Sequence, residues 1–132
     1  MKKVILLLSL FLFLSAETFG QTNVSGALSS DTTWSLSNSP YTVTGNVLVP
    51  DEVTLTIEAG VTVKVNSGLY IKIQGSLVAI GTVSDKITIT SNESSPNKGD
   101  WDKIWLASTS TTFDDNDNYV SGTIFNHCII SY

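Results

Sequence analysis

The residues with the clearest capacity for chemistry lie in the acidic segment DDNDN, residues 114–118. Asp114, Asp115 and Asp117 supply carboxylate oxygens, the ligand type that calcium prefers. Paired carboxylates can also act as the acid and base of glycoside hydrolysis, provided that their separation is fixed. The EF-hand pattern fails, because Tyr119 stands where that loop needs glycine and Phe125 where it needs the closing glutamate. We interpret the segment as a solvated acidic loop, with calcium as the alternative, and assign no catalytic residue.

The single histidine and the single cysteine are adjacent, at His127 and Cys128. A catalytic Cys–His pair requires the two side chains to converge, whereas consecutive residues of a strand point to opposite faces. With Ile124, Cys128 and Ile130 facing inward, His127 faces solvent. Zinc needs more ligands than one cysteine and one histidine supply, so we expect a structural cysteine and an exposed histidine.

Three large side chains sit between inward-facing neighbours in short alternating segments. They are Leu48 in NVLVP, Tyr70 in LYIKI and Trp105 in IWL. Leu48 and Tyr70 are separated by the repeat length described below, and Trp105 would follow on the next coil. An exposed apolar strip of this kind needs an explanation. We consider contact with a polysaccharide, the alternative being a strip covered by the cap or by a long loop.

The segments that carry these residues alternate apolar and polar positions with period two. VTLTI, VTVKV, LYIKI and ITIT are examples, and glycines separate them. This pattern predicts strands with one buried face, joined by tight turns. Strands of an ordinary parallel sheet are covered on both faces and read as continuous apolar runs, so these strands belong to another architecture.

An internal repeat identifies that architecture. A shift of about 22 residues superposes the following pairs: Val47 on Leu69, Val49 on Ile71, Leu55 on Leu77, Ile57 on Ala79, Val61 on Val83, and Val65 on Ile87. A shift of about 18 residues, expected for a left-handed hexapeptide helix, fits less well. One coil of about 22 residues cannot bury its apolar side chains alone, so stability must come from stacked neighbours.

We therefore predict an all-β fold, a right-handed parallel β-helix of about three coils. The coils would run from Val43 to Val65, from Leu69 to Thr90, and from Trp101 to Ile130, within a helix spanning residues 43–132. Residues 21–42 would cap the N-terminal end, with Trp34 and Leu36 over the core. An adhesin-like β-sandwich of hairpins is the alternative fold.

Residues 1–20 are expected to be a secretory signal peptide. Lys2 and Lys3 precede an apolar run, and small residues stand at the −3 and −1 positions before Gln21. We expect no transmembrane segment in the mature chain. That chain would hold five lysines, no arginine and eleven acidic residues. This composition argues against nucleic acid as a partner. One cysteine excludes an internal disulfide.

The order of several blocks resembles the beginning of secreted bacterial proteins of the pectin-lyase-like superfamily. The blocks are SPYTVTGNVLVPDEVTLTIEAGVTVKV, IQGSLVAIGTVSDKITITSN, GDWDKIWL and FNHCIISY. The resemblance implies a right-handed β-helix, an N-terminal cap over the first coil, and a secreted, extracellular or cell-surface location in a bacterium. Members of the superfamily include polysaccharide lyases and hydrolases.

From these observations we expect a structural scaffold portion of a secreted β-helix protein that contacts polysaccharide. The alternative is a fragment of a polysaccharide lyase or glycoside hydrolase whose catalytic coils are missing. The last strand-rich segment, residues 121–132, has no polar cap. We therefore expect either that the chain is the start of a longer protein or that it associates end to end through an open coil edge. The sequence assigns no cofactor other than the calcium candidate.

Overall fold

The computed structural model of the chain describes residues 20–107 and 110–132. The expected signal peptide therefore lies outside the described residues, except for Gly20. The elements, in chain order, are β1 (Thr22–Ala27), β2 (Thr32–Trp34), the 3-10 helix η1 (Leu36–Asn38), β3 (Tyr41–Val49), β4 (Thr54–Ile57), β5 (Thr62–Val65), β6 (Tyr70–Ile73), β7 (Ser76–Ile80), β8 (Ile87–Ser91), β9 (Lys103–Leu106), β10 (Thr112–Phe113), β11 (Tyr119–Ser121), β12 (Ile124–Asn126) and β13 (Cys128–Ile130).

The chain winds in one direction and forms a parallel β-helix. β4 and β5, which flank the turn at Gly60, do not pair with each other; β4 pairs with β2 and β7, and β5 with β3 and β8, all in parallel. The turn itself bonds to the coils above and below, since Glu58 N–H donates to Trp34 O and Gly60 N–H to Asp85 O. The positive φ of Gly60, 80°, suits glycine at this corner. The predicted right-handed β-helix is confirmed, and the β-sandwich is excluded.

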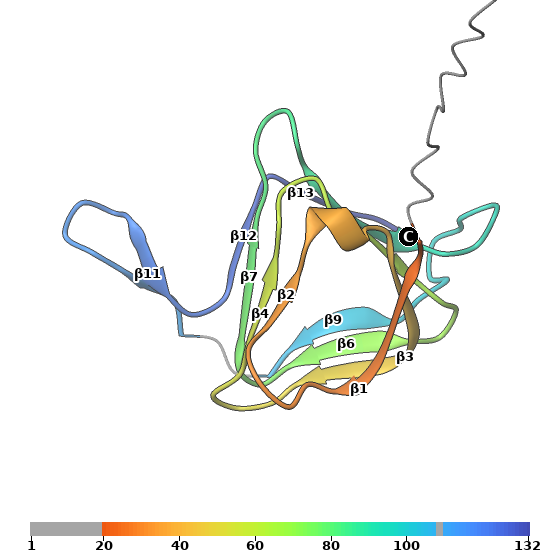
Figure 1. Cartoon of the computed structure of the whole chain (residues 1–132), viewed down its shortest axis with the longest axis horizontal. Coiled ribbons are helices and arrows are strands. Elements are labelled where there is room, and N and C mark those ends of the chain that lie inside the picture. Colours follow the sequence, from red (N-terminus) through yellow and green to blue (C-terminus); the bar gives the residue numbers. More distant parts are fainter. Residues whose placement is uncertain (1–19, 108–109) are drawn as a thin grey trace, which may run out of the picture.

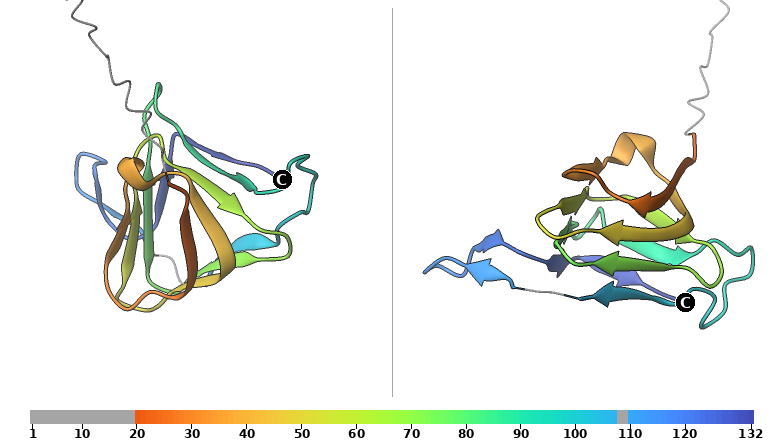
Figure 2. Two further views of the ribbon diagram at one scale, coloured as in Figure 1. Left: turned by 45° about the vertical axis from the view of Figure 1, so that its right-hand side comes forward. Right: turned by 90° about the horizontal axis from the view of Figure 1, so that it is seen from below.

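Three faces, each built of parallel strands, surround the core and give the end-on view a triangular outline (Figure 1). One face holds β5, β8, β13 and the start of β3; the second holds β6, β9 and the end of β3; the third holds β2, β4, β7 and β12. The first half of β1 pairs with the start of β3, and the second half of β1 pairs with the end of β3. Seen from the side, the coils lie as successive layers (Figure 2, right).

Inward positions of stacked strands fill the core in columns. β4, β5 and β6 share the pattern of a half-buried residue followed by a buried one, as alternation along a strand requires. The buried apolar residues are Trp34, Tyr41, Val43, Val47, Val49, Leu55, Ile57, Val61, Val63, Val65, Ile71, Ile73, Leu77, Ala79, Ile87, Ile89 and Trp101.

The repeat is less regular than a constant shift would make it. The predicted shift holds between β4 and β7, where Leu55 pairs with Leu77, and between β3 and β5, where Val43 pairs with Val65. On the second face the spacing is longer, because Val47 pairs with Ile71 and not with Leu69. Between β5 and β8 it is longer still, because Val65 pairs with Ser91 and not with Ile87. The corners differ in length from coil to coil, so the spacing changes from one strand pair to the next even on the same face, and four of the six sequence-based superpositions are wrong.

Residues 21–42 lie at the N-terminal end of the helix, where β1 and β2 continue the parallel ladders. Trp34 is 2% exposed and stacks on Tyr41, with ring centroids 5.1 Å apart. The expectation that Leu36 covers the core is wrong, because this side chain is 49% exposed. It lies on η1 beside the turn at Gly60, and its N–H donates to Glu58 Oε2 at 2.8 Å.

The coil that begins at Trp101 departs furthest from the repeat. Between β9 and β12, the antiparallel hairpin of β10 and β11 projects away from the triangular body (Figure 1). None of the helical segments formed by the described residues has the length and apolar character needed to cross a bilayer.

Candidate functional site

The outer face of β3, β6 and β9 carries the predicted strip. Leu48 pairs with Lys72, and Lys72 pairs with Trp105, so these three residues form one outward column. Tyr70 pairs with Lys103 in the neighbouring column. The sequence-based repeat aligns Tyr70 with Leu48, but the longer spacing found on this face moves Tyr70 two positions along it. We call Leu48, Tyr70, Lys72, Lys103 and Trp105 the outer strip.

Trp105 is the most accessible tryptophan of the described chain. It is 47% exposed, whereas Trp34 and Trp101 are 2% and 7% exposed. Lys72 Nζ stands 4.5 Å from the centroid of the Trp105 ring and Lys103 Nζ 6.0 Å from it. A cation over an aromatic ring at this distance is attracted by the ring's electron density. Lys103 Nζ also forms a salt bridge with Asp102 Oδ2, at 3.2 Å. The strip thus combines an apolar surface with the charge of Lys72 and an exposed ion pair.

The two lysines of the strip were missed by the sequence analysis, although a signal for each of them was present. Lys72 follows Tyr70 by two positions in LYIKI, so alternation alone places both on the same outward face. Lys103 precedes Trp105 by two positions in KIWL, so the same alternation places these two residues on one outward face.

The acidic segment forms the tip of the β10–β11 hairpin. The backbone N–H groups of Asn116 and Asn118 donate to Asp114 Oδ1 at 2.8 and 2.9 Å, and Asn118 Nδ2 donates to Asp114 Oδ2 at 3.0 Å. These bonds lower the pKa of the Asp114 carboxyl, the side-chain amide of Asn118 being the largest cause. Asp115 and Asp117 are exposed beside it.

The structure therefore gives Asp114 a local partner for each of its oxygens. Across the residues that the structure describes, no group of three or more His, Cys, Asp or Glu side chains is arranged to hold a metal ion. The calcium hypothesis for Asp114, Asp115 and Asp117 stays a prediction.

His127 and Cys128 lie at the corner between β12 and β13. His127 is exposed, with a positive φ of 50°, and Cys128 packs against the core. Burial raises the pKa of the Cys128 thiol, whose Sγ lies 3.4 Å from the carbonyl oxygen of Ala79. The expected inward orientation of Ile124 is wrong, since it pairs with the outward Val78, while Phe125 pairs with the inward Ala79. The corner at His127 shifts the alternation by one position.

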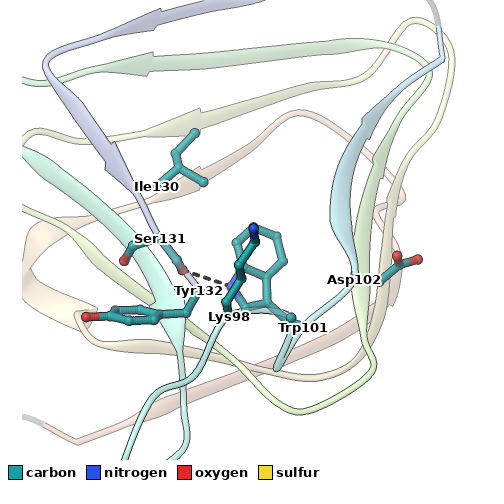
Figure 3. A pocket seen from close by; sticks show the side chains of 7 residues that line it. Lys98, Trp101, Asp102, Ile130, Ser131 and Tyr132 are labelled. Atoms are coloured by element: carbon teal, nitrogen blue, oxygen red, sulfur yellow. Dashed lines mark hydrogen bonds between the residues drawn. The ribbon is translucent and has the colours of Figure 1, made fainter.

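Two hollows lie at the end of the helix formed by β9, β12 and β13, on either side of Trp101. One, of about 320 Å³, lies between Trp101, Ile130 and Tyr132 (Figure 3). The other, of about 380 Å³, lies between Trp101, Leu106 and Phe125. Trp101 itself is fixed, because its Nε1–H donates to the carbonyl oxygen of Ser131 at 3.0 Å.

Comparison with known proteins identifies one family. Residues 26–123 match the family model described as a pectate-lyase-like β-helix domain. The comparisons with curated proteins and with solved structures gave no match.

Proposed function

The chain belongs to the family of pectate-lyase-like β-helix domains, and we propose that it is the scaffold portion of a secreted or cell-surface protein that contacts polysaccharide through the outer strip. The parallel β-helix holds the strip on one flat face. The polysaccharide would lie along the strip and across the coils, with a sugar ring against Trp105.

One observation carries the proposal: Trp105 on β9 is 47% exposed while Lys72 Nζ stands 4.5 Å from its ring. An exposed aromatic ring presents a large apolar surface at low conformational cost. Leu48 extends that surface in the same column. An exposed apolar patch rimmed by polar groups is a common mark of a binding surface.

The charges on the strip favour an acidic polysaccharide. The whole chain has a formal charge of −5, yet the outward positions of β6 and β9 are Tyr70, Lys72, Lys103 and Trp105. Asp102 lies 3.2 Å from Lys103 Nζ and offsets its charge, so the positive potential on this face comes mainly from Lys72. A uronate carboxylate would pair with Lys72.

The test measures the binding of residues 21–132 to polygalacturonate and to an uncharged polysaccharide by affinity electrophoresis and by tryptophan fluorescence. Trp105→Ala is expected to weaken binding of the acidic polymer about tenfold, since loss of a stacking surface costs about 1.4 kcal/mol. Lys72→Ala is expected to weaken binding of the acidic polymer and to leave the uncharged one unaffected.

Matched controls separate the strip from general surface effects. Phe113→Ala removes another exposed aromatic ring, on the β10–β11 hairpin, and Lys64→Ala removes a lysine from β5 on another face. Both should bind as the parent does. Equal binding by the Trp105→Ala variant, or equal losses in all variants, would refute the proposal.

Secretion forms part of this proposal and is supported by the basic and apolar character of residues 2–16. Expression of the full chain in a bacterium, with N-terminal sequencing of the exported product, tests it. A product that begins at Gln21 is expected. Retention of the intact chain in the cytoplasm would contradict this part of the proposal.

A further inference from the structure

The two lysines of the outer strip differ in their partners. Lys103 Nζ lies 3.2 Å from Asp102 Oδ2, whereas Lys72 forms no salt bridge with any of the described residues, 20–107 and 110–132. Both amines approach the same ring, since Lys72 Nζ is 4.5 Å and Lys103 Nζ 6.0 Å from the centroid of Trp105. A carboxylate of the protein itself therefore stands close to the ring on which the polysaccharide is proposed to lie.

The backbone holds Asp102 at the start of β9. Its N–H donates to the carbonyl oxygen of Leu69 at 2.9 Å. The side chains of Trp101 and Asp102 turn to opposite sides of the chain, with Trp101 packed in the core (Figure 3). The side chain of Asp102 is 47% exposed, so its carboxylate is accessible to a ligand as well as to Lys103.

This carboxylate affects a bound sugar differently according to the charge of the sugar. Like charges repel, and a uronate placed near Lys103 would also face Asp102. A neutral sugar carries hydroxyl groups, which can donate to a carboxylate and accept from an ammonium group. The strip thus offers a place for an acidic sugar at Lys72 and a place for a neutral sugar at the Asp102–Lys103 pair.

We propose that Asp102 is a specificity-determining residue of the outer strip, and that it favours polysaccharides in which acidic sugars are separated by neutral ones. The inference rests on the proposed polysaccharide contact and adds to it the charge density of the polymer. The uronate pairs with Lys72, and a neighbouring neutral sugar bonds to Asp102 and Lys103. A polymer in which every sugar is acidic brings a second carboxylate against Asp102.

A purely orienting role for Asp102 predicts the opposite effect of its removal. If the carboxylate served only to direct Lys103 toward a uronate, Asp102→Asn would weaken the binding of a fully acidic polymer. If the carboxylate repels a second uronate, the same variant strengthens that binding. The sign of the change therefore distinguishes the two roles.

The test compares polygalacturonate with the same polymer after part of its carboxyl groups has been reduced to alcohols. Isothermal titration calorimetry at low salt measures the binding of residues 21–132 to each polymer. We expect the parent to bind the partly reduced polymer about threefold more tightly than polygalacturonate, a difference typical of exposed charges. Asp102→Asn should bind polygalacturonate about threefold more tightly than the parent does, and this gain should fall at high salt, because exposed charges are screened.

Asp85→Asn is the matched control. It removes the same charge from an exposed residue in the corner between β7 and β8, neither of which belongs to the face that carries the strip. This variant should bind both polymers as the parent does.

Iodide quenching of tryptophan fluorescence tests the electrostatic basis without a polysaccharide. Trp34 and Trp101 are buried, so quenching reports mainly on Trp105. Asp102→Asn should raise the iodide quenching constant about twofold at low salt, because a more positive local potential concentrates anions. Quenching by acrylamide, which is neutral, should stay unchanged.

The outcomes separate this inference from the proposed function. If the parent binds neither polymer, the proposed function fails and the role of Asp102 fails with it. If the parent binds both polymers equally, or if Asp102→Asn does not strengthen the binding of polygalacturonate, only the role of Asp102 is overturned. An equal gain in Asp85→Asn, or unchanged iodide quenching in Asp102→Asn, would overturn it as well.

Discussion

Asp114 turns its carboxylate back onto the hairpin that carries it. Its oxygens accept hydrogen bonds from Asn116 and Asn118, and so the charge helps to close the tip between β10 and β11. Aspartate side chains commonly close turns by bonding to the backbone two positions on. The acidic segment therefore has a structural role that its composition alone did not reveal.

The lowered pKa of Asp114 predicts how the tip responds to acid. A depressed carboxyl pKa contributes stability that is fully present above the unfolded value, about 3.9, and is lost as the pH falls through the lower folded value. Asn118→Ala removes the largest cause of the shift and should move the pKa of Asp114 upward. An NMR titration of the Asp114 side-chain carboxyl carbon measures both values, and an unchanged pKa in the variant would contradict the assignment.

Outward orientation of single side chains was predictable, whereas their neighbours were not. Alternation placed Leu48, Tyr70 and Trp105 outward, as they are found. The prediction failed for Ile124, because the inward positions of β12 and of β13 do not belong to one continuous alternation. The corner at His127 shifts the alternation by one residue. Which outward residues share a column depends on the number of residues in the corners between strands. The alternation within one strand gives no information on that number.

At the scale of the strands, the corners decide how coils align. The corner after β6 passes directly beneath the corner after β3, and Gly75 lies at this crossing. A Cβ atom built on Gly75 would stand 2.1 Å from Val53 O and 2.3 Å from Pro50 O. Only a residue without a side chain fits there, because the neighbouring atoms are backbone.

Gly75→Ala is expected to lower the free energy of unfolding by about 3 kcal/mol, since the backbone must shift to admit the methyl group. Gly26→Ala is the control: Gly26 has a φ of 82° but nothing within 4 Å of the added Cβ. Its cost should be about 1 kcal/mol, the strain of a left-handed alanine. Urea denaturation gives both values, and equal losses would contradict the role of the close crossing.

The registers between strands were only partly predictable. Two strand pairs keep the spacing that the sequence predicts, β4 with β7, from Leu55 to Leu77, and β3 with β5, from Val43 to Val65. Between β6 and β9 the spacing is much longer, from Ile71 to Ile104, because the loop before Trp101 adds length outside the coil. A comparison of the sequence with itself at one constant shift cannot find the register between strands when the loops that connect them differ in length.

For the whole molecule, stability comes from columns of apolar side chains shared between coils. Leu77 lies in such a column, beneath Leu55, and is 1% exposed. The architecture itself was predictable, because alternating strands with one wet face and no helices admit few ways to bury their apolar side chains. The hairpin of β10 and β11 was not, because its short strands resemble a polar loop.

Leu77→Ala is expected to lower the free energy of unfolding of the molecule by about 2–5 kcal/mol, the usual cost of a cavity left by a buried leucine. Val78→Ala, the next residue on the same strand, points outward and should cost less than about 1 kcal/mol. Thermal and urea denaturation followed by circular dichroism compare the two. Similar losses would mean that the inward columns do not hold the fold together.

The variation in corner length has a practical consequence. The three sides of the triangle contain the hydrogen-bonded strands. The connections between β8 and β9 and between β9 and β12 contain long segments that lie outside these strands. A foreign peptide spliced into the β10–β11 tip would thus be displayed at a distance from the body that folds. The β-helix could therefore be used to display epitopes, because the inserted peptide can be changed while the coils stay the same.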